Sequence, residues 1–254
     1  IVSNGCIATS QFTTIVSEPN IMNLQFDIDS ISCYGETDAA INLSVNFSNQ
    51  SYSEILWSNG ATVEDISNLG IGNYSLTVTD SFGCRSFDYI EITQPNQLFI
   101  SLIAQDAICF AEASGQIFTN IIGGTQPYNF QWSDGSTVQN PTNLLASTYW
   151  LELVDANFCT EYDSIEIFEG AEILLSPTIE DILCFGLGNG SIDMTVSGGS
   201  PPYTTMWSNA ATTEDISNLQ AGIYHFLVTD SLGCTDSIEL GITQPLQTLS
   251  AILS

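Results

Sequence analysis

Seven cysteines are the residues of this 254-residue chain best suited to covalent chemistry. Six of them form three pairs whose members lie 51, 50 and 50 positions apart, and the pairs recur every 75 or 76 positions. Regular pairs without Cys-x-x-Cys clusters favour a disulfide framework in an oxidising compartment over a zinc site. The spacing predicts the bonds Cys33–Cys84, Cys109–Cys159 and Cys184–Cys234, with Cys6 bonded to a residue outside this sequence.

Two other states of the cysteines stay open. Bonds between neighbouring pairs would span 25 to 27 residues and would join Cys6 to Cys33, Cys84 to Cys109 and Cys159 to Cys184. Reduced, inert thiols in a protein core are the third state. We favour bonds within each pair because repeated domains usually carry their own staple. The chain-entropy account assigns a loop of this length roughly 4 kcal/mol of stabilisation.

Carboxylates near turns are the second set with candidate chemistry. Calcium prefers carboxylate and carbonyl oxygens from loops, and a chain of net charge −28 attracts divalent cations. However, the chain has no D-x-[DN]-x-[DN]-G loop, and Gln139-Asn140 stands where the other copies have Glu-Asp. Asp80, Asp155 and Asp230 are better explained as turn residues that bond their own backbone. No cofactor is expected, and diffuse association of cations is favoured over a specific site. Ca2+ is the one alternative, with the candidate ligands Glu64, Asp65, Asp80, Asp155, Glu214, Asp215 and Asp230.

Catalysis is not expected. His225 is the only histidine, and the equivalent positions of the other copies hold Ser75 and Trp150. A catalytic or metal-binding histidine should keep its identity between copies, so Ser-His-Asp and Cys-His mechanisms are excluded. The chain also lacks a Walker-type loop and a lysine for phosphate chemistry.

The charge balance excludes further classes of partner. The chain has 29 acidic side chains and one basic one, Arg85, yet only 12% of its residues are charged and 44% are hydrophobic. This composition indicates packed cores rather than an acidic disordered tail. Nucleic acid is excluded because no set of basic residues can meet phosphates. Adhesion to anionic lipid headgroups is disfavoured for the same reason. The sequence contains no apolar run of transmembrane length, so direct membrane insertion is not expected.

The sequence motifs around these side chains repeat along the chain with the same period as the cysteine pairs. Trp57-Ser58-Asn59-Gly60 returns as Trp132-Ser133-Asp134-Gly135 and as Trp207-Ser208-Asn209-Ala210. A fixed period of about 75 residues indicates one unit copied in tandem. We predict the tail of a preceding repeat (1–20), a first copy (21–95), a divergent second copy (96–170), a third copy (171–245) and the start of a following repeat (246–254).

Each copy reads as an all-β unit. In the third copy, alternating residues and Gly/Pro-rich turns predict strands at 173–182, 191–197, 203–207, 212–219, 222–230 and 234–244. Such a unit is typical of a small immunoglobulin-like sandwich, and we expect tandem sandwiches in an elongated array. Trp57, Trp132 and Trp207 are predicted core residues. Trp150 lies outside that register. Partial cover by a neighbouring loop is the favoured interpretation, and the alternative is a surface contact, either to sugar or to a neighbouring repeat.

The recurring motifs of the third copy resemble the SprB repeat. The resemblance is carried by Cys184-Phe185-Gly186-x-x-Asn189-Gly190-Ser191-Ile192, Gly198-Gly199-x-Pro201-Pro202-Tyr203, Trp207-Ser208-Asn209, Glu214-Asp215-Ile216-Ser217-Asn218-Leu219, Ala221-Gly222-x-Tyr224 and Val228-Thr229-Asp230-x-x-Gly233-Cys234. It is strong in the third copy, good in the first and looser in the second. The first copy lacks Gly-Gly-x-Pro at residues 46–51.

The resemblance implies a function and a location. SprB repeats build a giant surface adhesin of gliding bacteria that use type IX secretion, and they also occur in other large secreted proteins of these bacteria. The resemblance therefore implies a filament that is attached to the outer membrane and acts in surface attachment and gliding motility. Its implied partners are neighbouring repeats, an extracellular surface or polysaccharide, and motility and secretion machinery reached through other parts of the protein. The alternative is a spacer stalk that presents a remote enzyme or carbohydrate-binding domain. The O-glycosylation pattern of such bacteria is matched at Ser30, Ser164, Ser231 and Ser237.

Overall fold

The computed structural model describes residues 22–46 and 51–246, and all the regular structure in them is β-strand. Within these two ranges, six strands fall in each predicted copy. The first copy contains β1 (Asn23–Asp29), β2 (Ala39–Asn46), β3 (Tyr52–Trp57), β4 (Ile66–Leu69), β5 (Gly72–Asp80) and β6 (Arg85–Ile92). The second contains β7 (Phe99–Gln105), β8 (Gly115–Ile122), β9 (Asn129–Trp132), β10 (Thr142–Leu144), β11 (Ser147–Val154) and β12 (Thr160–Ile167). The third contains β13 (Ile173–Glu180), β14 (Gly190–Gly198), β15 (Thr204–Trp207), β16 (Ile216–Leu219), β17 (Gly222–Thr229) and β18 (Thr235–Ile242).

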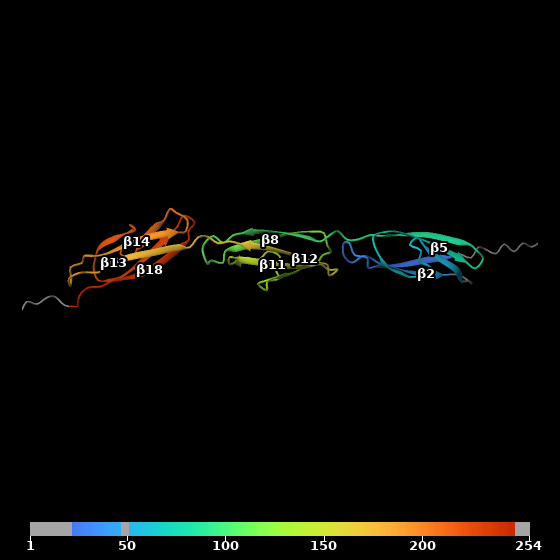
Figure 1. Cartoon of the computed structure of the whole chain (residues 1–254), viewed down its shortest axis with the longest axis horizontal. Coiled ribbons are helices and arrows are strands. Elements are labelled where there is room, and N and C mark those ends of the chain that lie inside the picture. The colour runs from blue at the N-terminus through green and yellow to red at the C-terminus, as the bar shows by residue number, and fades with distance from the viewer. Residues whose placement is uncertain (1–21, 47–50, 247–254) are drawn as a thin grey trace, which may run out of the picture. The chain divides into compact units, whose positions relative to one another are not determined.

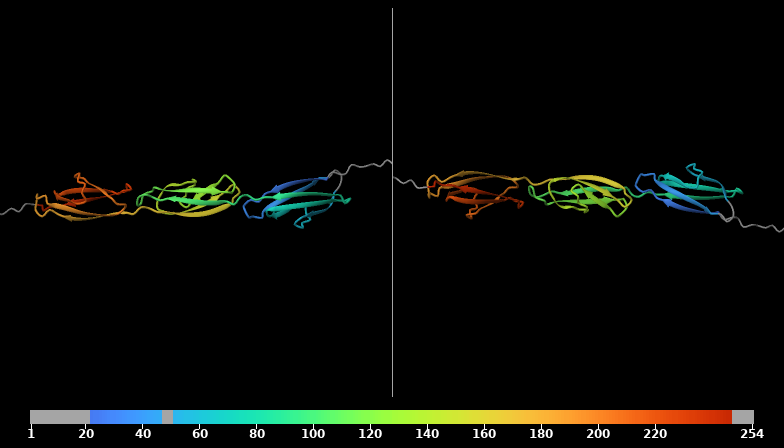
Figure 2. Two further views of the ribbon diagram at one scale, coloured as in Figure 1. Left: turned by 90° about the horizontal axis from the view of Figure 1, so that it is seen from above. Right: turned by 90° about the horizontal axis from the view of Figure 1, so that it is seen from below.

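Each copy is a sandwich of two three-stranded antiparallel sheets. In the third copy, one sheet has the order β13-β14-β16 and the other the order β15-β17-β18. The first and second copies repeat this arrangement strand for strand. The two layers of each copy are visible edge-on in Figure 2. The protein therefore consists of tandem immunoglobulin-like β-sandwiches.

The alternation of residues along the strands builds these layers. In β17, Phe226 and Val228 are fully buried, whereas Ile223 and His225 lie on the outer face. The pairing of His225 with Glu239 on β18 keeps both polar residues on that outer face. A shift of one residue would reverse the two faces, so the apolar pattern fixes the register.

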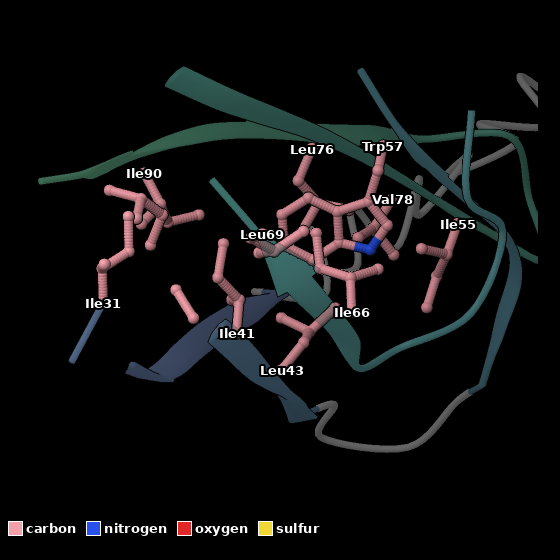
Figure 3. Close-up of a cluster of buried hydrophobic side chains, with 12 residues drawn as sticks. Ile31, Ile41, Leu43, Ile55, Trp57, Ile66, Leu69, Leu76, Val78 and Ile90 are labelled. Atoms are coloured by element: carbon pink, nitrogen blue, oxygen red, sulfur yellow. The ribbon is translucent and has the colours of Figure 1, made fainter. Parts of the chain in front are cut away.

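Each copy has its own hydrophobic core. The structure buries Trp57, Trp132 and Trp207, whose side chains are 1%, 1% and 2% exposed, as their spacing predicts. Figure 3 shows Trp57 in the middle of the first core, surrounded by aliphatic side chains of both sheets. Each indole Nε1 donates to a backbone carbonyl six residues later, at 2.9 Å to Val63, 2.9 Å to Val138 and 3.0 Å to Thr213. The bond satisfies the one polar atom of each buried ring.

The first and last strands of a copy run in the same direction. In the third copy, the Ile182 amide donates to the Thr243 carbonyl at 3.0 Å, so the ends of β13 and β18 lie together (Figure 1). At the opposite end, the Gly199 amide donates to Glu172, and the Ser200 amide donates to Asp230, next to the hairpin that begins β18. The hairpin is thus separated from the end of β13 by the length of the strand.

The chain divides into two compact units, residues 1–97 and 98–254. The second unit holds both the second and the third copies. The predicted tail of a preceding repeat (1–20) lies outside the described residues, as does all of the predicted following repeat except Leu246.

Candidate functional site

A disulfide joins the second copy to the third. Cys109 lies in the loop after β7, and Cys234 lies at the end of the hairpin before β18. Their Cα atoms are 5.4 Å apart although 125 positions separate them in the sequence. This bond shows that the predicted pairs Cys109–Cys159 and Cys184–Cys234 are wrong. Cys84 and Cys184 carry free, exposed thiols, so the predicted pair Cys33–Cys84 is wrong as well.

Strand direction explains why the pairs within a copy cannot form. Cys184 follows the end of β13, whereas Cys234 precedes β18, which runs in the same direction. A strand of eight residues such as β18 spans about 26 Å, and two Cα atoms more than about 7 Å apart cannot be bridged. The alternative bonds Cys84–Cys109 and Cys159–Cys184 are also wrong, because Cys109 is bonded to Cys234 and Cys184 is free. Cys33 and Cys159 are disulfide-bonded too, and Cys6 lies outside the described residues.

The two copies pack closely around this bond. Cys109 contacts the hydrophobic core of the third copy, and Cys234 is 8% exposed. The sulfur of Cys234 lies 3.7 Å from the Ile108 carbonyl oxygen. Gly170, in the segment between the copies, leaves no room for a side chain, because a Cβ there would overlap that same carbonyl. We call this contact the cystine junction, and it consists of the loop around Cys109, the segment 168–173 and the hairpin at Cys234.

The loop half of the junction is held by its own copy. The Glu112 amide donates to the Cys109 carbonyl at 3.4 Å, which closes a tight turn. Ala111 in this turn has a φ of 54°, and its amide donates to the Glu169 carboxylate at 2.7 Å. Glu169 thus ties the loop to the end of the copy. Glu169 was not predicted as a functional residue. The only sign of it in the sequence is that a glutamate or glutamine follows each loop cysteine by about 60 positions.

An aspartate holds the hairpin half. Asp230 Oδ1 accepts the amides of Leu232 and Cys234, each at 2.9 Å, and Oδ2 accepts the Ser200 amide at 2.9 Å. Although burial alone would raise the pKa of this carboxyl, the amides of Ser200, Cys234, Leu232 and Gly233 lower it below its usual value. The carboxylate is therefore held ionised by the backbone of the hairpin.

The same arrangement recurs at Asp80 and Asp155, the other two candidate calcium ligands in hairpins. Asp80 Oδ1 accepts the amides of Phe82 and Cys84 at 2.8 Å. Asp155 accepts the amides of Asn157, Cys159 and Thr125 and is 1% exposed. These carboxylates have the turn role predicted for them.

The Glu-Asp pairs also bond to backbone. Asp65 Oδ1 accepts the Leu43 amide at 3.0 Å, and Asp215 Oδ1 accepts the Met194 amide at 2.9 Å. Asn140 takes the equivalent place in the second copy and accepts the Thr119 amide at 2.8 Å. These oxygens extend the sheet just before β4, β10 and β16 begin, which explains why an asparagine serves as well as an aspartate.

The two glutamates of these pairs have different partners. Glu214 accepts the Val196 amide at 2.9 Å. A hydrogen bond with the Glu64 carboxylate raises the pKa of Tyr52. Within residues 22–46 and 51–246, no three His, Cys, Asp or Glu side chains come together as a metal site would require.

The remaining candidate residues lie on the surface. Trp150 is 62% exposed on the outer face of β11, where it pairs with Ser164 of β12. His225 lies 3.5 Å from Glu239 on the equivalent face of the third copy, and both side chains are mostly exposed. The four serines that match the glycosylation pattern are exposed: Ser30, Ser164, Ser231 and Ser237. In the part of the chain that the structure describes, no helix has the length and apolarity needed to span a membrane.

The solved structures that match this chain share little of its sequence. No curated protein sequence matches the chain. Among solved structures, titin domains I67–I69 match with a TM-score of 0.40 at 11% identity, covering 89% of this chain and 99% of that one. Sidekick-1 immunoglobulin domains 1–5 match with a TM-score of 0.37 at 12% identity, covering 89% and 59%. The eight N-terminal Ig domains of DSCAM match with a TM-score of 0.29 at 9% identity, covering 88% and 48%.

The family comparison is more specific. The sequence profile described as SprB repeat matches residues 101–137 and 176–212, which lie at equivalent places of the second and third copies. The second copy, which the quoted motifs fit more loosely than the first, is thus one of the two that match. Disulfides and SprB repeats are features of an extracellular structural protein of the adhesin type. The second and third copies each contain a match to the SprB repeat.

Proposed function

We propose that this chain is a tension-carrying segment of a large bacterial surface filament that acts in attachment and gliding motility. The observation that supports the proposal is the bond between Cys109 and Cys234, which joins successive copies instead of stapling one copy internally. A filament that pulls a cell along a surface must resist extension without losing its folded domains. A covalent bond between neighbouring domains supplies that resistance.

The position of the bond determines which strands resist force. A pull on the two ends of residues 98–254 passes from Cys109 to Cys234 through the sulfur atoms, so the residues between them bear no load. The strands β8 to β17 all lie inside this closed loop. Only β7 and β18 of the second and third copies remain in the path of the force. The hydrophobic cores of these two copies are therefore largely protected from mechanical unfolding.

Single-molecule stretching of the full chain from its two ends tests the mechanical part of the proposal. Breaking the bond releases a loop closed over 125 positions, so a reducing agent should lengthen the fully extended chain by at least about 430 Å. The control is the oxidised chain with its free thiols blocked by a maleimide. Equal extension of oxidised and reduced chains would refute a mechanical role for the bond.

The cellular part needs the parent bacterium. Replacing both Cys109 and Cys234 by serine should weaken attachment under flow and slow gliding, while the amount of protein displayed at the surface stays constant. Replacing Thr148 and Thr195, which are exposed on strands and lie outside the glycosylation pattern, by alanine serves as the matched control for two surface substitutions. Normal attachment and gliding in the cysteine variant would contradict the proposal.

Trp150 supports a second, adhesive role for the second copy. Its indole is exposed on the same outer face as Tyr162, which is 66% exposed and whose hydroxyl donates to Glu152 at 2.7 Å. Exposed flat rings beside polar groups suit contacts to sugar rings, since such rings offer apolar area with little loss of conformational entropy. Saturable binding to a polysaccharide that is lost in Trp150→Ala would support this role. Unchanged binding in that variant would remove it.

A further inference from the structure

We propose that the outer face of β7 and β8 is a self-association surface, which packs on the same face of another molecule of this chain. Eight side chains of these two strands point away from the core of the second copy, and none of the eight is charged. We call this set the neutral face, and it consists of Phe99, Ser101, Ile103, Gln105, Gln116, Phe118, Asn120 and Ile122. The proposal stands apart from the mechanical role of the cystine junction.

Two rows of the neutral face are apolar. Phe99 pairs with Ile122, and Ile103 pairs with Phe118. The exposed fractions of these side chains, in that order, are 52%, 59%, 63% and 45%. Directly opposite side chains of an antiparallel pair have Cβ atoms ~5 Å apart, so each row is a continuous apolar strip across both strands. Exposed apolar residues scattered singly need no explanation, but paired rows of them indicate a contact surface.

Two polar rows complete the pattern, and both are uncharged. Ser101 pairs with Asn120 between the apolar rows, and Gln105 pairs with Gln116 at the end of the face. Alternate residues of a strand lie ~6.8 Å apart, so an apolar row, a polar row and a second apolar row follow one another at equal steps. This part of the pattern is therefore symmetric about the row of Ser101 and Asn120.

The equivalent faces of the other copies are acidic. The strand registers place Ile103 where the first copy has Asp27, and Phe118 where the third copy has Asp193. Each of those faces carries two exposed carboxylates: Asp27 and Asp29 in the first copy, and Glu180 and Asp193 in the third. Folding of a copy thus does not require apolar side chains on this outer face, because the other two copies fold with charged ones. The neutral face therefore reflects a contact outside the core of its own copy.

The symmetry of the rows identifies the partner as an identical face. When two such faces stack with a twofold axis over the row of Ser101 and Asn120, each apolar row meets an apolar row. The hydroxyl and amide groups of the two central rows then meet and can exchange hydrogen bonds. The first and third copies do not fit this place, because their carboxylates would be buried against apolar rows. For a chain of net charge −28, the neutral face also lets two molecules meet without direct contact between carboxylates.

The size of the neutral face sets the strength of the association. The six steps along β7 from Phe99 to Gln105 give a length of ~20 Å, and two strands with their side chains are ~15 Å wide. The face therefore covers ~300 Å² per molecule, whereas a stable complex buries about 800 Å² per partner. We expect a weak and reversible dimer, which forms where molecules of this chain are concentrated.

Sedimentation equilibrium of the full chain, with its free thiols blocked by a maleimide, tests the association. The mass of the parent should rise from 27.4 kDa toward twice that value as the chain concentration passes ~0.1 mM. Ile103→Asp and Phe118→Asn give the neutral face the residues that the first copy has at the same places, so this fold accepts them. The dissociation constant of this variant should be at least ~tenfold higher, because each molecule then brings a carboxylate into the apolar contact.

A second pair of substitutions is the matched control. Met206 and Leu227 form an exposed apolar pair on the outer face of the third copy. Met206→Gln and Leu227→Glu give that pair the residues of the second copy, Gln131 and Glu152, and add one negative charge, as the test variant does. This control should dimerise like the parent. A parent that stays monomeric at ~1 mM would overturn the proposal, as would equal dissociation constants of the two variants.

Crosslinking tests the register of the two faces. Asn120 lies in the central row, and stacked sheets lie ~10 Å apart, so a bis-maleimide of that span should join two Asn120→Cys chains. This chain and its control both carry Cys6→Ser, Cys84→Ser and Cys184→Ser. The control has Thr195→Cys, at the equivalent place of the third copy, and should give about tenfold less linked dimer. Equal yields would overturn the proposal, and so would a polysaccharide that binds the neutral face of a monomeric parent.

Discussion

Asp230 and Ser200 connect two loops of the third copy that are 30 positions apart in the sequence, since the Ser200 amide donates to Asp230 Oδ2 at 2.9 Å. The same carboxylate accepts the Cys234 amide through its other oxygen. One ionised side chain therefore fixes both the loop after β14 and the hairpin that carries a junction cysteine. The stability of this end of the copy depends on the charge of that carboxylate.

Acid should selectively weaken this end of the third copy. Backbone amides lower the pKa of Asp230 in the folded state against the opposing effect of burial. A lowered folded pKa means that the stabilisation is fully present above the ordinary value of 3.8 and is lost as the pH falls through the folded pKa. Unfolding by urea at a series of pH values should show the parent more stable than Asp230→Asn at neutral pH, with the difference shrinking below pH 3.8. A constant difference across that range would contradict the assignment.

Removal of Asp155 should destabilise the second copy. Asp155→Ala leaves three partly buried amides without an acceptor. An unsatisfied buried group costs about 1–3 kcal/mol, and partial access of water keeps each cost at the low end, so we expect the free energy of unfolding to fall by about 3 kcal/mol. Asp155→Asn should cost less, because its amide oxygen can still accept from Asn157 and Cys159. Urea denaturation measures both losses. A larger loss in the asparagine variant would be inconsistent with the hydrogen bonds described.

Phe158→Gly should stabilise the protein. Phe158 has a φ of 65° and is 85% exposed, at the hairpin position where the other copies have Gly83 and Gly233. A left-handed conformation costs a residue with a Cβ about 1–2 kcal/mol, and part of the gain is offset by the greater freedom of glycine when unfolded. We expect the free energy of unfolding, measured by thermal or urea denaturation, to rise by about 0.5–1 kcal/mol. Gly233→Phe should change the stability in the opposite direction.

Gly170→Ala should loosen the cystine junction without unfolding either copy. The new Cβ would overlap the Ile108 carbonyl oxygen. Reduction of the Cys109–Cys234 bond by dithiothreitol should become about tenfold faster, the change that ~1.4 kcal/mol of lost contact free energy produces. Gly222→Ala is the matched control, because no atom lies within 4 Å of the Cβ that it would add. Equal reduction rates in the two variants would show that the junction does not shield its disulfide.

Trp132→Phe should lower the free energy of unfolding by about 2 kcal/mol, since the Val138 carbonyl loses its hydrogen-bond donor and the core loses side-chain volume. Trp150→Phe should change the stability by less than about 0.5 kcal/mol, because this ring lies on the surface. Urea unfolding, followed by the fluorescence of the remaining tryptophans, distinguishes the two. Similar losses would mean that the burial of Trp132 contributes little.

The strands and the core tryptophans could be predicted from the sequence because they depend on local patterns. Alternation in β17 places Phe226 inside and His225 outside whatever the neighbouring copies do. The turn role of Asp80, Asp155 and Asp230 is local as well, since each bonds amides two and four residues later.

The cysteine partners could not be read from spacing, because a constant repeat step makes several pairings equally regular. The deciding fact is three-dimensional: the first and last strands of a copy are parallel, so Cys184 and Cys234 lie at opposite ends. The predicted sandwich contained that information, but it required tracing strand directions through the whole copy. The role of Asp65 was equally hidden, since its contact with Leu43 depends on where β4 joins the sheet.

The bond between the loop of one copy and the hairpin of the next has a genetic consequence. Unequal recombination between tandem repeats adds or removes whole copies. Because each junction needs only a loop cysteine and the hairpin cysteine of whichever copy follows, such an event rejoins matching halves at the new boundary. A partial deletion would instead leave an unmatched thiol inside the array. Whole repeats can therefore be added or lost while each loop cysteine still meets a hairpin cysteine in the next copy.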